Sequence, residues 1–146
     1  MTSKNLPAKN NNNNNTGNLY NDITQLIRQG KRRVATEVNS TVVILYWSIG
    51  KRINDEILLD KRADYGEQAI NSIANKLTLE FGKGYSRSSL FRMLRFVKLY
   101  PNHQIVATVS RQLSWSHIVL LCQIDNDLKR DFYMQMACVE QRSVRA

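Results

Sequence analysis

Residues 65–100 decide the fold, and they read YGEQAINSIANKLTLEFGKGYSRSSLFRMLRFVKLY. The first half has an apolar side chain at every fourth position, which predicts a helix over Tyr65–Phe81. These apolar residues are Ala69, Ile73, Leu77 and Phe81. Gly82–Gly84 should end this helix, because glycine closes helices in the left-handed conformation. Ser86 is a preferred N-cap for a second helix that runs to Tyr100 and is stopped by Pro101. Two helices joined by a short glycine-containing turn have the layout of a helix-turn-helix.

The second helix separates into two faces when its residues are placed about 100° apart. One face is apolar and consists of Leu90, Met93, Leu94, Phe96, Val97 and Tyr100. The other face is polar, and every charged residue on it is basic. Together with the turn and the cap, it supplies the residues that we predict to contact DNA: Lys83, Ser86, Arg87, Ser88, Arg92, Arg95 and Lys98. The free backbone N–H groups after Ser86 would add an anion site at the start of the helix.

The basic bias extends beyond this helix, since residues 81–124 contain no Asp or Glu. Over the whole chain of 146 residues, 21 Lys and Arg outnumber 12 Asp and Glu, giving a net charge of +9. Such a balance favours a polyanionic partner, either nucleic acid or an anionic membrane surface. An acid-free segment with a basic helix face favours nucleic acid, because Lys and Arg bind phosphates and Arg also binds guanine. A solvated surface face is the alternative. The sequence does not distinguish duplex DNA from RNA.

Two apolar residues, Phe91 and Leu99, interrupt the basic face. DNA readout does not require large apolar groups at these positions. They either pack under the preceding part of the chain or form a surface for another protein, and we expect packing.

The chain before residue 65 divides into a leader and a long helix. Residues 1–18 include the asparagine tract Asn10–Asn15 and have nothing to bury, so we expect a disordered leader followed by one domain at 19–146. From Leu19 to Ile57, apolar residues recur in steps of three and four, which predicts one long helix or two nearly collinear ones. Gly30 would break this helix, or its overhanging part would pack against a second copy in a homodimer.

The C-terminal part gives weaker signals. The β-branched stretch Ile105–Val109 fits a short strand or a helical turn. Two further helices are expected over Trp115–Ile124 and Asp127–Glu140. The second has Leu128, Phe132, Met136 and Val139 in helical register. The predicted fold class is all-α, a helical domain with a long N-terminal helix and a helix-turn-helix-like core.

No constellation indicates catalysis, so we expect no catalytic residue, no metal site and no cofactor. Cys122 and Cys138 lie in apolar helical stretches and should be small core residues. His103 and His117 lack metal-ligand spacing with them, and Ser114 before Trp115 fits a helix cap. The N-terminus has no signal-peptide core, and the longest apolar run is far too short to span a bilayer. We therefore expect a soluble, cytoplasmic protein without a membrane partner.

A series of ordered motifs adds a resemblance. These are YWSIGKRI at 46–53, Tyr65–Gly66, FGKGYS at 81–86, LSWSH at 113–117, Phe132–Tyr133 and Ser143–Arg145. The series resembles the N-terminal domain of the bacterial YhcG-like nuclease family over roughly residues 20–145. Members of that family continue into a C-terminal PD-(D/E)XK nuclease domain.

The resemblance implies an all-helical domain that binds DNA and delivers it to the nuclease domain. This chain departs from the family where it stops at Ala146, so cleavage is not carried over to it. Arg142 also stands where the family tends to have tryptophan. The sequence therefore predicts the DNA-binding module of a nuclease-type protein, without enzymatic activity of its own. The alternative is a protein-interaction or oligomerisation module that uses the long first helix.

Overall fold

The computed structural model describes the backbone of residues 2–59, 62 and 64–145 and the side chains of residues 17–59, 62 and 64–141. Every regular element in this part of the chain is a helix, which confirms the predicted all-α fold. The chain divides into two compact units, Met1–Glu37 and Val38–Ala146, which are described separately. No helix in the described part is both long and apolar enough to cross a membrane.

The first helix, α1, extends from Thr2 to Leu59 and confirms the long N-terminal helix. It continues through Gly30, where an added Cβ would have no neighbour within 4 Å. It also begins ahead of the asparagine tract. Because the side chains of residues 1–16 lie outside the described residues, the expected disordered leader stays a prediction.

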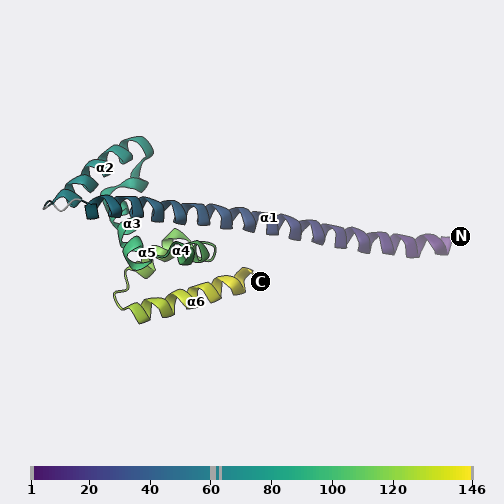
Figure 1. Ribbon diagram of the computed structural model, residues 1–146. Helices are drawn as coiled ribbons and strands as arrows, with labels where there is room; N and C mark the ends of the chain where they lie inside the picture. The colour runs from purple at the N-terminus through teal and green to yellow at the C-terminus, as the bar shows by residue number, and fades with distance from the viewer. Residues whose placement is uncertain (1, 60–61, 63, 146) are drawn as a thin grey trace. The chain divides into compact units, whose positions relative to one another are not determined.

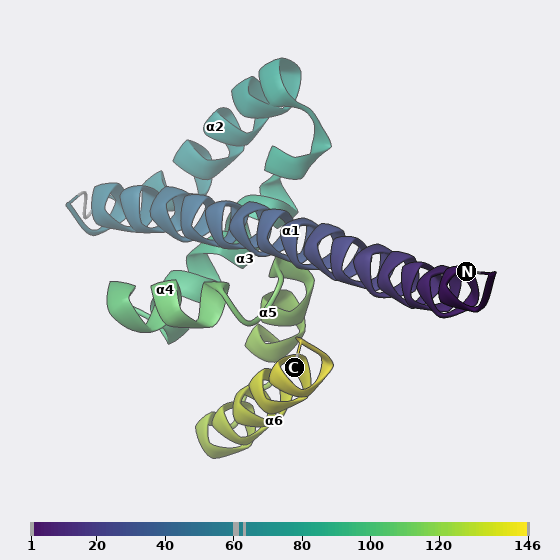
Figure 2. The same cartoon turned by 90° about the vertical axis from the view of Figure 1, so that its right-hand side faces the viewer.

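The second unit contains the end of α1 and all later helices. They are α2 (Tyr65–Phe81), the 3₁₀ helix η1 (Lys83–Tyr85), α3 (Arg87–Leu99), α4 (His103–Ser110), α5 (Trp115–Cys122) and α6 (Asp127–Arg145). In both ribbon views α5 lies between α3 and α6 (Figure 1 and Figure 2). The ambiguous stretch Ile105–Val109 is helical and belongs to α4. Asn102 caps this helix, because its side-chain oxygen accepts the N–H groups of Gln104 and Ile105 at 2.9 and 3.3 Å.

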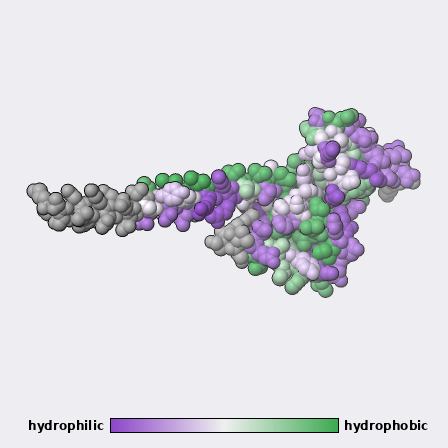
Figure 3. Space-filling view, turned by 180° about the vertical axis from the view of Figure 1, so that it is seen from behind, coloured by the Kyte–Doolittle hydropathy of each residue, from purple (hydrophilic) through white to green (hydrophobic). Residues whose placement is uncertain are grey.

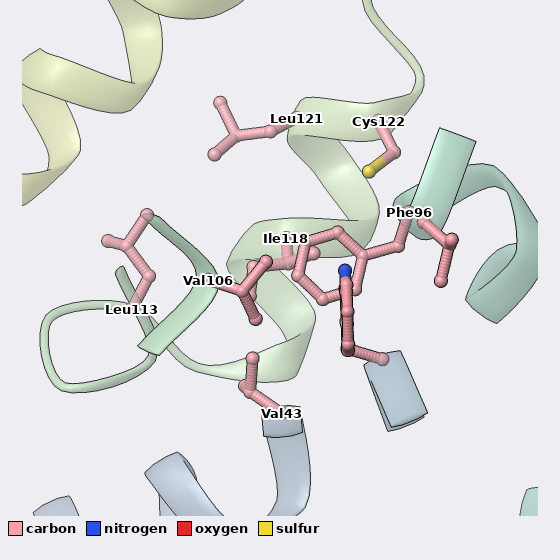
Figure 4. Close-up of a cluster of buried hydrophobic side chains, with 9 residues drawn as sticks. Val43, Phe96, Val106, Leu113, Ile118, Leu121 and Cys122 are labelled. Atoms are coloured by element: carbon pink, nitrogen blue, oxygen red, sulfur yellow. The ribbon is translucent and has the colours of Figure 1, made fainter. Parts of the chain in front are cut away.

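One core cluster joins α1, α3, α4, α5 and the loop between α4 and α5, and Figure 4 shows its side chains converging from these segments. It consists of Val43, Trp47, Phe96, Val97, Val106, Leu113, Ile118, Leu121 and Cys122. The Trp47 indole N–H donates to the Tyr100 carbonyl at 2.8 Å, so the ring is buried without losing its hydrogen bond. Burial raises the pKa of the Cys122 thiol to about 11, which suits an inert core residue and confirms that interpretation. Cys138 is half-buried against the same cluster.

A second cluster joins α1, α2 and α3. Its buried members are Ile53, Ile70, Ala74, Leu90, Met93 and Leu94. The buried face of α2 is therefore centred on Ile70 and Ala74, one residue away from the predicted stripe. Ile73 is 37% exposed and Phe81 is 61% exposed. Tertiary packing thus buries a face of this amphipathic helix that is rotated by one residue from the predicted apolar face.

The last helix also turns a different face inward than its strongest apolar spacing indicates. Leu128, Phe132, Met136 and Val139 are all exposed. The side chains of α6 that pack against the first cluster are Met134, Ala137 and Cys138. Near its start, buried Arg130 donates to the Ile124 carbonyl at 2.7 Å and to the Asp127 carboxylate, and so ties the first turn of α6 to the loop that follows α5. The expectation attached to Arg142 lies outside the described side chains.

Candidate nucleic-acid interface

The α3 helix is held in place by its cap and by its apolar face. Ser86 has an extended backbone, and its hydroxyl accepts the Ser89 N–H at 3.3 Å, which confirms it as the N-cap. The buried residues are Leu90, Met93, Leu94, Phe96 and Val97, in agreement with the predicted apolar face. The opposite face of α3 is exposed, and it carries the basic residues.

The connection from α2 to α3 is short and specific in its backbone. Gly82 has φ 97°, in the left-handed region that favours glycine, and its N–H donates to the Thr78 carbonyl at 2.9 Å. The 3₁₀ helix η1 follows and leads directly into Ser86. Tyr85 anchors this segment, because its ring contacts the rings of Phe81 and Tyr46 edge-on at 5.8 and 6.2 Å. The predicted helices and glycine turn are therefore present, and Lys83 lies in the connection.

Four of the predicted contact residues are exposed to solvent. They are Lys83, Ser88, Arg92 and Lys98. Among the described residues, no ion pair or hydrogen bond engages the Arg92 guanidinium or the Lys98 ammonium group. These two cations lie about two turns apart on the exposed face and are available to an anion. The Ser86 hydroxyl, by contrast, is occupied as a cap, so its observed role is to position the helix.

Arg87 is partly neutralised by α2. Its guanidinium donates to the Glu67 carboxylate at 2.9 Å, and it also lies over the Phe91 ring, 5.0 Å from the centroid. Both charged side chains are more than half exposed. An exposed ion pair of this kind contributes only about 0–1 kcal/mol, so an external phosphate could displace the carboxylate.

Arg95 has a structural role in addition to its charge. It donates through Nε to the Cys122 carbonyl at the end of α5, and through a terminal nitrogen to the Asp125 carboxylate at 3.0 Å. These bonds connect α3 to the loop before α6. Neither Glu67 nor Asp125 was identified from the sequence. Asp125 follows the acid-free segment directly, but only the packing of the helices shows which arginine it meets.

A groove of about 650 Å³ runs beside the basic face. Its walls come from the end of α1, the start of α2 and α3, through Asn54, Ile57, Gly66, Glu67, Ile70, Arg87, Phe91, Leu94, Arg95, Lys98 and Leu99. Phe91 is 39% exposed in this groove and shares it with Ile57 of α1. Leu99 is half-buried and packs against the first core cluster. Packing therefore explains Leu99, whereas Phe91 remains on the surface under Arg87.

The histidines and Ser114 serve the fold. The His117 ring nitrogen Nδ1 accepts the Ser114 N–H at 3.2 Å and lies 2.9 Å from the Ser114 hydroxyl, which forms a capping box at the start of α5. His103 packs edge-on against Trp47 at 5.3 Å. In the part of the chain that the structure describes, no three His, Cys, Asp or Glu side chains are grouped so that they could hold a metal ion.

The fold and this face define an all-helical domain that exposes a basic helix beside a mixed apolar and polar groove. The sequence matches the family described as the DUF1016 N-terminal domain over residues 22–146, and the chain belongs to this family. It is also 28% identical over 97 residues to a protein of Escherichia coli (strain K12) that carries the name "Putative nuclease YhcG". The alignment covers 66% of this chain and 26% of that protein, so the chain spans about a quarter of its relative. No solved structure matches. The resemblance to a YhcG-like N-terminal domain is confirmed.

Proposed function

We propose that this domain binds nucleic acid, with duplex DNA as the expected ligand, through the exposed face of α3. The observation that carries the proposal is the pair Arg92 and Lys98, two exposed cations without an ion-pair partner among the described residues. Lys83 adds a third positive charge in the turn that precedes the helix. Cations so placed attract phosphates without regard to base sequence.

The arrangement of α2 and α3 supports a helix-turn-helix mode of binding. The two helices pack against each other through Ile70, Ala74 and the buried face of α3. In that mode the second helix enters the major groove, which is wide enough for an α-helix, and Arg side chains bind guanine edges. Arg87 and Arg95 would then also contact DNA, once a phosphate displaces their carboxylate partners or binds beside them. Ser86 and Ser88 would offer hydroxyls near the start of α3.

The relationship to a protein named as a nuclease supports the same ligand class. We propose that the domain supplies DNA binding to proteins of this family and carries no catalytic step itself. Cleavage would belong to a C-terminal nuclease domain of the longer relatives, which is the partner that the domain would serve.

The test compares DNA affinity over a salt series for the parent chain and for Arg92→Ala with Lys98→Ala. Losing two phosphate contacts should reduce the slope of log affinity against log salt by about 2. Lys76→Ala with Lys129→Ala is the matched control, because it removes the same charge from exposed positions on α2 and α6. An equal loss in both double variants would reduce the effect to net charge and contradict the assignment to α3. Parallel titrations with duplex RNA of the same sequence decide between DNA and RNA.

A further inference from the structure

The unit Met1–Glu37 exposes an apolar helical face of its own. Six large side chains on α1, which we call the apolar stripe, are between 47% and 69% exposed: Leu19, Tyr20, Ile23, Leu26, Ile27 and Val34. At about 100° per residue they fall within an arc of roughly 120°. Figure 3 shows green side chains along one edge of this segment and purple along the opposite edge. The stripe has the width of a core-facing helix surface, yet all six of its side chains are exposed.

A helix with such a stripe needs a partner to be stable in water. Isolated helices are marginal even with favourable sequences, and most of their stability in proteins comes from packing an apolar face. We propose that the occupant is a second copy of this chain, and that the two segments pair antiparallel through their apolar stripes. This inference does not depend on the proposed DNA binding.

Charge decides the direction of pairing. The basic cluster Lys31–Arg33 lies near one end of the stripe, whereas Asp22 is the charged residue near the other end. Parallel pairing would set the two basic clusters side by side at the same level, which repels. Antiparallel pairing places each cluster beside the opposite end of the second copy. Asp22 and Arg33 lie on the same edge of the helix, and antiparallel helices bring like edges together, so Asp22 would face Arg33 of the second copy.

The stripe is also self-complementary in size when the pair is centred near Ile27. Ile23 then lies opposite Gly30 of the second copy, and Val34 lies opposite Leu19 and Tyr20. The surroundings of Gly30 are open, because an added Cβ would meet nothing within 4 Å. A branched side chain can therefore fill the space that glycine leaves. Parallel pairing would instead align the two glycines and leave a gap in the interface.

The first experiment is sedimentation equilibrium of the full chain without DNA. The parent chain should be a dimer, and Ile23→Asp with Ile27→Asp should weaken it by at least about tenfold, since two buried apolar side chains per copy become charged. Asn21→Asp with Gln25→Asp adds the same charge on the opposite face, at the same spacing and at exposed positions, and should leave the dimer within about threefold of the parent. A parent chain that is monomeric, or a dimer insensitive to the Ile23 and Ile27 substitutions, overturns the proposal.

The second experiment tests the direction of pairing by charge reversal. Asp22→Arg and Arg33→Asp should each weaken the dimer by about fivefold, because each disturbs two symmetric pairs. The combined variant should restore affinity to near the parent value. Failure of the combined variant to recover overturns the antiparallel arrangement. Near-UV circular dichroism of Trp47 and Trp115 confirms that each variant keeps the core of the second unit. Loss of dimerisation would leave the salt dependence of the α3 variants to be tested on its own.

Discussion

Gly50 lies where the backbone of α1 passes close to the backbone of α3. A Cβ at this position would lie 2.4 Å from the Met93 carbonyl oxygen and 2.8 Å from the Val97 methyl carbon Cγ2. The first of these atoms belongs to a helix backbone and cannot swing aside. The contact also carries the second core cluster, which includes Ile53 of α1 and Met93 of α3. Glycine is therefore required here by space.

We expect Gly50→Ala to lower the free energy of unfolding by about 1–3 kcal/mol, the usual cost of overpacking a core. This net loss should appear even though alanine gains up to about 1 kcal/mol in helix propensity. Gly84→Ala is the control, because an added Cβ there has nothing within 4 Å. Urea unfolding followed by tryptophan fluorescence measures both variants. Equal effects at positions 50 and 84 would contradict a steric role for Gly50.

Single residues could be predicted where their role is local. Ser86 was identified as an N-cap from its position before an amphipathic run, and the cap bond is present. Gly50 belongs to the motif YWSIGKRI at 46–53, but nothing in its sequence position distinguishes it from any other glycine within a helix. Its role depends on a helix that begins 37 residues later. Contacts of this kind are set by tertiary packing and leave no local pattern.

At the scale of elements, α3 shows the same division. Its own spacing predicts its buried face, because helix geometry alone decides which residues share a side. The partners of its cations come from elsewhere: Glu67 from α2 and Asp125 from the loop after α5. The predicted basic face thus contains two kinds of cation. Arg92 and Lys98 have no ion-pair partner among the described residues, whereas Arg87 and Arg95 are paired with carboxylates.

We expect Glu67→Gln to strengthen DNA binding, because it releases Arg87 and removes a negative charge from the groove. One additional phosphate contact should steepen the salt slope by about 1 and raise affinity several-fold at low salt. Stability should change little, since exposed ion pairs contribute only about 0–1 kcal/mol. Fluorescence anisotropy titrations at several salt concentrations measure the effect.

The matched control is Glu56→Gln, which removes the same charge and frees Arg52 on α1, its partner at 3.0 Å. If both substitutions strengthen binding equally, the gain reflects net charge. In that case Arg87 has no special place in the interface.

At the scale of the whole molecule, the sequence predicts the long first helix, but it does not predict which part of that helix belongs to the core. The apolar steps from Leu19 to Ile57 are continuous. Nevertheless, the buried members of both core clusters begin within the second unit, at Val43 and Ile53, and the large apolar side chains from Leu19 to Val34 are exposed. Periodicity shows that a face is apolar, and it does not show which stretch of that face the same chain covers.

We therefore expect a chain that begins at residue 34 to fold by itself. It keeps one helical turn ahead of Val38, the buried Ser40–Ser110 hydrogen bond of 2.9 Å and both core clusters. Its cooperative unfolding, followed by circular dichroism at concentrations low enough to keep the parent chain monomeric, should match that of the parent within about 1 kcal/mol, because the deleted side chains bury little surface within one copy. A chain that begins at residue 48 loses Val43 and Trp47 and should not unfold cooperatively.

The chain that begins at residue 34 lacks all of the apolar stripe except Val34, so the antiparallel pairing predicts that it is monomeric. It should still show the salt-slope difference between the parent α3 face and Arg92→Ala with Lys98→Ala, since every residue of that face is retained. A non-cooperative chain from residue 34 would mean that the N-terminal unit supports the core, contrary to the division of the molecule at Val38.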